Sequence, residues 1–129
     1  MSALPAATVR RVVNGVLRGE RRYAEVAVTF LGPVRMRALN REHLGHDYPT
    51  DVISFALTGP DGSLVGDVYV CRSVAAKQAE QLGVSLRQEL IRLVVHGTLH
   101  VLGYEHPEGE GRIRSAMWKK QERYVARLA

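Results

Sequence analysis

Three of the five histidines in this sequence, His96, His100 and His106, fall within eleven residues. In a helix, residues four apart lie on the same face, so His96 and His100 can direct their imidazoles at one point. Gly103 can adopt a positive φ, which commonly ends a helix and lets the chain bring His106 to that point. Three neutral imidazoles around an open fourth position, taken by water, are typical of a catalytic zinc site. The spacing predicts one zinc ion per chain, although nickel and iron also accept imidazole ligands.

The residue after the first histidine limits the reactions that a metal site here could catalyse. The spacing matches the long zincin signature H-E-x-x-H-x-x-G-x-x-H, whose glutamate is the general base of a metalloprotease. This sequence has Gly97 at that position, which argues against peptide hydrolysis. The remaining chemistry is water activated by zinc, or zinc acting as a Lewis acid on a carbonyl or phosphoryl oxygen. Glu105, beside His106, could act as a base or orient that ligand, or be a solvated loop carboxylate.

The charge of the chain indicates a polyanionic partner. It has 18 basic and 13 acidic residues, a net charge of +5 and a pI of about 9.8. Up to Arg41 there are eight arginines against two glutamates. Such an excess favours RNA or DNA through counterion release, but a merely soluble basic protein is an equal alternative. The basic last helix likewise fits either a polyanionic partner or a solvated face.

The composition argues against a membrane-spanning protein and against one held together by disulfides. An apolar fraction of 46% and a charged fraction of 24% are ordinary for a soluble globular protein. No apolar run approaches the roughly 20 residues that span a bilayer, so we expect no membrane partner. Cys71 is the only cysteine, which excludes an intrachain disulfide and fits a cytoplasmic location.

Hydrophobic periodicity and turn residues predict eight elements. The expected helices are 6–18, 34–44, 72–81, 86–102 and 112–128, and the expected strands are 25–31, 51–57 and 64–71. Strand 25–31 reads as buried on both faces, and strands 51–57 and 64–71 as an antiparallel hairpin. Gly66 within a strand indicates a bulge or a close backbone approach. Helix 86–102, with Ser85 as its N-cap, should be the buried central helix.

Together these elements predict an α+β fold over residues 1–129. We expect a single layered domain with a small mixed sheet of about four strands, flanked by helices and holding a metal cleft.

Three ordered motifs then resemble those of a known family. HGTLHVLGYEH at 96–106 resembles the H-G-x-L-H-L-x-G-Y-D-H signature of the YbeY family, the bacterial rRNA-maturation endoribonucleases. The stretch from Leu39 to Phe55 and the run from Leu64 to Val68 are similar to its second and third signatures. The resemblance implies a zinc-dependent, single-strand-preferring endoribonuclease acting in 16S rRNA 3′-end maturation and ribosome quality control. Its partners would be 16S rRNA and the small ribosomal subunit, with no dinucleotide cofactor.

The resemblance makes His96, His100 and His106 the zinc ligands, with Glu105 in place of the usual aspartate. One position departs from the family pattern: Leu44 stands where many members carry an arginine that contacts RNA. A leucine cannot donate to a phosphate. We hypothesise that Arg41, one helical turn earlier, takes over this contact. The alternatives are that His46 does so, or that the activity is weaker or different.

Two other functions remain open at this point. One is a non-catalytic ribosome-assembly factor that binds rRNA and holds the metal for structural reasons. The other is a metal-dependent hydrolase of small substrates or peptides, which Gly97 and the basic charge disfavour.

Overall fold

The computed structural model describes residues 3–105, 111 and 115–129. In these ranges the helices are α1 (Ala6–Glu20), α2 (Pro33–Leu44), α3 (Arg72–Leu82), α4 (Leu86–Val101) and α5 (Ala116–Leu128). The strands are β1 (Glu25–Leu31), β2 (Val52–Thr58) and β3 (Leu64–Cys71). The predicted elements are therefore confirmed in type and order to within two residues at most ends. The predicted start of the last helix, 112–114, lies outside the described residues. No helix in the described part of the chain is long and apolar enough to cross a membrane.

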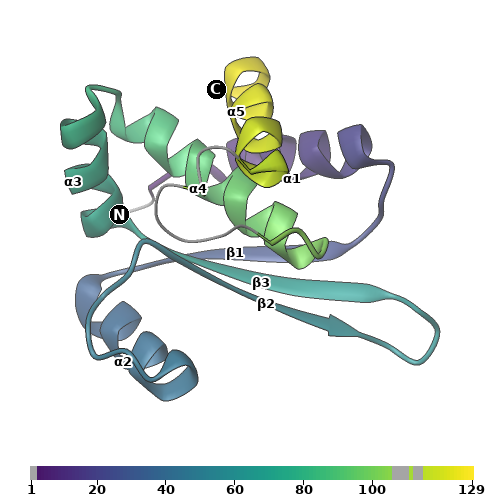
Figure 1. Cartoon of the computed structure of the whole chain (residues 1–129), viewed down its shortest axis with the longest axis horizontal. Helices are drawn as coiled ribbons and strands as arrows, with labels where there is room; N and C mark the ends of the chain where they lie inside the picture. The colour runs from purple at the N-terminus through teal and green to yellow at the C-terminus, as the bar shows by residue number, and fades with distance from the viewer. Residues whose placement is uncertain (1–2, 106–110, 112–114) are drawn as a thin grey trace.

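The described strands form one mixed sheet in the order β1-β3-β2. β3 pairs in parallel with β1, where Val28 lies beside Val68, and antiparallel with β2, where Ser54 lies beside Val68. The predicted hairpin of β2 and β3 is confirmed, as is the α+β class. The sheet has three strands in the described residues, one fewer than expected. Helices α1, α4 and α5 lie on one side of the sheet and α2 on the other (Figure 1).

Strand β1 corrects one prediction. It is an edge strand in which exposed residues alternate with partly buried ones, so it is not buried on both faces. Val26, Val28 and Phe30 pack on the main core, whereas Ala27 and Thr29 point to solvent. The reason is that the second, smaller core under α2 reaches β1 only at Leu31. An alternating strand needs a cover on one face only.

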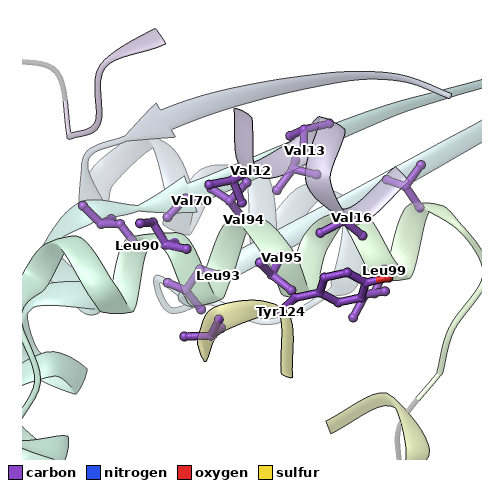
Figure 2. Close-up of a cluster of buried hydrophobic side chains, with 14 of the residues drawn as sticks. Val12, Val13, Val16, Val70, Leu90, Leu93, Val94, Val95, Leu99 and Tyr124 are labelled. Atoms are coloured by element: carbon purple, nitrogen blue, oxygen red, sulfur yellow. The ribbon is translucent and has the colours of Figure 1, made fainter. Parts of the chain in front are cut away.

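Helix α4 is the centre of the main core. Its apolar side chains, including Leu90, Val94 and Leu99, are fully buried. Figure 2 shows them between the valines of α1 and the Tyr124 ring of α5. Val68 and Val70 of β3 close the cluster from the sheet side. Each such buried side chain stabilises the fold by about 1.5–3 kcal/mol, so burial fixes the helix that carries the two histidines.

Both ends of α4 are set by local sequence, as predicted. Ser85 is the N-cap and its Oγ accepts a hydrogen bond from the Gln88 backbone N–H at 3.0 Å. At the other end Gly103 has a φ of +99°, and its N–H donates to the carbonyl of His100 at 2.9 Å. The chain therefore leaves the helix three residues after the second histidine.

Two glycines let α4 lie close to the sheet. A Cβ added at Gly97 would sit 2.4 Å from Val68 Cγ1 and 3.1 Å from Ser54 Oγ. A Cβ added at Gly66 of β3 would sit 2.5 Å from both methyl groups of Val101. The close backbone approach predicted at Gly66 is thus confirmed. Gly97 faces the sheet, so a glutamate there would place a carboxylate in the core.

We expect Gly97→Ala to lower the free energy of unfolding by up to about 2 kcal/mol. The added methyl overpacks the interface at a cost of about 1–3 kcal/mol, and the better helix propensity of alanine returns about 1 kcal/mol. Urea unfolding measures the effect. Gly97→Ala combined with Val68→Ala should lose less than the sum of the two single changes, since Val68 supplies the clash. Strict additivity would contradict the close-packing explanation.

Candidate metal centre on helix α4

His96 and His100 converge as their spacing predicted. Their Nε2 atoms lie 3.1 Å apart and their ring centroids 4.6 Å apart. His96 is 6% exposed, and His100 is partly exposed. The pair thus has one ring anchored in the core and one that solvent or a ligand can reach.

Gln121 of α5 determines which nitrogen of the neutral His96 ring carries the proton. Its Oε1 lies 2.6 Å from His96 Nδ1, and its Nε2 donates to Glu122 Oε2 at 3.0 Å. Because the amide nitrogen faces a carboxylate, the amide oxygen must face His96. An amide oxygen only accepts, so the proton of the neutral ring is on Nδ1. The Nε2 lone pair of His96 then points toward His100.

A chain of charged groups holds Gln121 in this orientation. Arg92 of α4 contacts both oxygens of Glu122, with Nε 3.0 Å from Oε2, and donates from Nη1 to Glu89 Oε1 at 2.7 Å. Burial raises the pKa of Glu89, and the Arg92 guanidinium opposes this shift only in part. The side chains of Glu89 and Arg92 are 3% and 12% exposed. The orientation of the His96 ring therefore depends on an ion-pair network buried between α4 and α5.

The pair has the geometry that a transition metal needs from two ligands. A tetrahedral ion bound at about 2.0–2.1 Å holds two ligand nitrogens about 3.3–3.4 Å apart, close to the 3.1 Å between the two Nε2 atoms. A hydrogen bond from Nδ1 to an acceptor is also the usual outer contact of a metal-bound histidine. His106, the predicted third ligand, lies outside the described residues, and among the described ones no group of three metal-ligating side chains assembles.

A cavity of about 250 Å³ opens beside the histidine pair. It lies between α3, α4 and α5, and its walls include Asp51, Gln78, His96, Trp118 and Gln121. Gln78 Nε2 donates to Asp51 Oδ2 at 3.1 Å, which joins α3 to the start of β2. A larger cavity, of about 410 Å³, is lined mainly by apolar side chains of α1 and β1, together with Arg10 and Asn14, and no histidine lines it. The smaller one is the candidate site, because polar groups converge on it.

The other predicted residues lie at different places. Glu105 is exposed at the end of the described stretch. Arg41 is exposed on α2 and His46 on the loop that follows, where its ring contacts Tyr48 at 5.6 Å between centroids. Within the described residues no contact joins Arg41 or His46 to the histidine pair, so their assignment to RNA stays a prediction. Leu44 is 51% exposed on the same helix.

Glu20 anchors the chain that follows α4. Its side chain is 8% exposed and accepts hydrogen bonds from the hydroxyls of Tyr104 and Tyr124 and from Lys120 Nζ at 2.9 Å. Burial raises the pKa of Glu20, but these three donors together lower it below its usual range. Burial and the neighbouring carboxylate raise the pKa of Tyr124 to about 12. Tyr104 thereby fixes the start of the segment that carries Glu105 and His106.

Sequence reasoning did not identify Gln121 or Glu20 as parts of the site. Gln121 is 1% exposed on the apolar face of α5, between Met117 and Val125. A polar residue on such a face was the available signal, since buried amides need partners. Glu20 had no such signal, because its partners come from 84 to 104 residues away.

Comparisons with known proteins agree with the sequence motifs. A family model described as endoribonuclease YbeY matches residues 3–129. A Chlorobium luteolum protein named endoribonuclease YbeY is 36% identical over 97% of this chain and 90% of its own. Its Geobacillus kaustophilus namesake is 44% identical over 81% of this chain and 73% of its own. The solution structure of TM1509 from Thermotoga maritima superposes with a TM-score of 0.67 at 28% identity, covering 95% of this chain and 79% of that one.

We expect Glu20→Gln to lower the free energy of unfolding by about 2 kcal/mol at neutral pH, because charge-assisted hydrogen bonds become neutral ones. The pKa of Glu20 is lowered on folding, so its stabilisation is complete above the ordinary value of 4.5 and is lost as the pH falls through the lowered value. Urea unfolding of both proteins between acidic and neutral pH tests this. A stability difference that did not shrink toward acidic pH would contradict the assignment.

Proposed function

Since the chain belongs to the YbeY family of endoribonucleases, we propose that it cleaves single-stranded RNA with a zinc ion bound by His96, His100 and His106. The single observation that supports this most is the convergence of the two Nε2 atoms at 3.1 Å, with the His96 proton held on the far nitrogen. Two imidazole nitrogens that converge on one point suit zinc better than any role in the core.

The protein's own groups supply orientation and access. Gln121 holds the His96 ring, and the Glu20 cluster holds Tyr104, two residues before the third predicted ligand in the sequence. The cavity beside His96 gives an RNA strand a route to the pair. Zinc, when bound, lowers the pKa of a coordinated water or withdraws charge from a phosphoryl oxygen. Gly97 faces the sheet and offers no base, which leaves the exposed Glu105 as the carboxylate nearest to the third ligand in sequence.

The cellular role in this proposal is maturation of the 16S rRNA 3′ end and ribosome quality control in the cytoplasm, together with the small ribosomal subunit. A cavity of about 250 Å³ beside His96 cannot hold a duplex, which supports single-strand preference. Arg41 or His46 would hold the RNA backbone on the α2 side in place of the arginine that Leu44 replaces.

A second candidate is an rRNA-binding assembly factor with a structural metal and no cleavage. The exposed Leu44 favours it, because a leucine cannot bind the phosphate that an arginine would. The two candidates share RNA binding and differ in catalysis.

We expect His100→Ala to abolish zinc-dependent cleavage of an unstructured RNA, because one ligand of the metal is lost. Chelation of the wild-type protein should have the same effect. Zinc content by mass spectrometry and RNA cleavage on gels measure the two outcomes, and a peptide panel serves as the control substrate. RNA binding without cleavage by either protein would favour the assembly factor, and cleavage of peptides alone would contradict both candidates.

We expect Gln121→Leu to weaken zinc binding about 10- to 100-fold, as other losses of an outer hydrogen bond to a metal-bound histidine do. Gln121→Glu is the matched control, because a carboxylate oxygen still accepts from Nδ1. Competition with a metal-sensitive dye gives the affinities, and circular dichroism checks that both variants fold. Equal zinc affinity for folded Gln121→Leu and wild type would show that the amide does not orient His96.

A further inference from the structure

The positive charge of this protein is concentrated in two helices. Residues 6–23, which contain α1, and 116–128, which contain α5, carry nine basic and two acidic residues, a net charge of +7. The rest of the chain carries nine basic and eleven acidic residues, a net charge of −2. The overall charge of +5 therefore hides a strongly basic pair of helices on an otherwise slightly acidic molecule.

The two acidic residues of these helices do not neutralise the exposed cations. Glu20 is occupied by Lys120 and two tyrosines, and Glu122 by Arg92 of α4. Eight exposed cations remain, and none of them forms an ion pair within the described part of the chain. We call five of them the basic ridge: Arg11, Arg18, Lys119, Arg123 and Arg127. The other three are Arg10, Arg21 and Arg22.

Contacts along the two helices bring the ridge together. Arg11 Nη1 donates to the Leu128 carbonyl at 2.9 Å, and a Cβ added at Gly15 would meet the Leu128 side chain at 2.8 Å. Further along, Glu20 binds Lys120 and Tyr124. The end of α5 thus contacts the first half of α1, and the middle of α5 contacts the end of α1. Arg11 and Arg18 share a helical face with Gly15, so they lie along the seam with α5.

A groove of about 290 Å³ lies in this seam. Its walls are Gly19 and Glu20 of α1, and Lys120, Arg123, Tyr124 and Arg127 of α5. Arg127 also lies over the Tyr124 ring, 5.1 Å from its centroid, which limits the conformations of the guanidinium. Two arginines one turn apart on the rim of a groove suit the oxygens of successive phosphates.

The groove also reaches the segment that follows α4. Glu20 in its wall accepts a hydrogen bond from the Tyr104 hydroxyl, and Lys120 lies over the Tyr104 ring, 5.0 Å from its centroid. A strand bound in the groove therefore lies beside the chain that leaves the helix after His100.

We propose that the basic ridge on α1 and α5 binds the sugar-phosphate backbone of single-stranded RNA and guides it to the histidine pair. This deepens the proposed function and rests on it for the identity of the strand as substrate. Binding is electrostatic and independent of base sequence, because the groove offers cations and no set of base-reading amides. The mechanism is the release of counterions from the RNA.

The test is the salt dependence of binding to an unstructured, uncleavable 2′-O-methyl RNA by fluorescence anisotropy. Arg123→Gln combined with Arg127→Gln should reduce the slope of log K against log salt by about 1.4, at about 0.7 per phosphate contact on a single strand. The affinity at about 0.1 M salt should fall roughly 10- to 30-fold. In cleavage assays of the zinc-loaded variant, KM should rise while kcat stays within about twofold of wild type.

The matched control is Lys77→Gln combined with Arg87→Gln, which removes the same charge from exposed positions of α3 and α4. An equal loss of RNA affinity in control and test variants would overturn the proposal, because net charge alone would then explain it. The proposal would also be overturned if the ridge variant bound RNA as wild type does but no longer bound polyglutamate. That result would assign the ridge to an acidic protein partner. Ridge-dependent RNA binding without cleavage by wild-type protein would leave the ridge intact and contradict only the catalytic function.

Discussion

The whole arrangement depends on how closely helix α4 lies against the sheet. Gly97 of α4 faces Val68 and Ser54, and Val101 covers Gly66 of β3. This contact buries one side of the helix and leaves the side that carries His96 and His100 next to α5 and the cavity. A side chain at either glycine would separate the layers, and a well-packed core has no space to absorb such a shift.

Because of the same contact, this site differs chemically from that of a zinc peptidase. The residue after His96 points into the core, so it cannot supply a base there. The histidines are instead oriented by a chain of polar and charged side chains. Gln121 of α5 orients His96, and Gln121 is itself oriented by Glu122, Arg92 and Glu89. Such a network stabilises a site only when every member has a partner, because an unpaired buried charge costs about 3–5 kcal/mol. Rigid support of this kind suits a pair of ligands that must keep one geometry.

Charge also has a spatial order that the composition conceals. The acidic residues of α1 and α5, Glu20 and Glu122, turn inward to their partners, while the basic residues of these helices other than Lys120 turn outward. The two carboxylates join the helices, and the exposed cations form no ion pair in the described structure. Fold stability and a surface suited to RNA thus come from the same two helices.

Local sequence was sufficient for the elements and for the histidine pair. Spacing of four on a helix, the Ser85 cap and the Gly103 stop are short-range features, and helical geometry alone makes His96 and His100 converge. The strand β1 was misjudged because edge position is a property of the sheet, not of the segment. Gln121, Glu20 and the inward-facing Gly97 were decided only by tertiary structure, because each acts through partners 25 to 104 residues away. Chain geometry can place ligands one turn apart, but only packing chooses the groups that orient them.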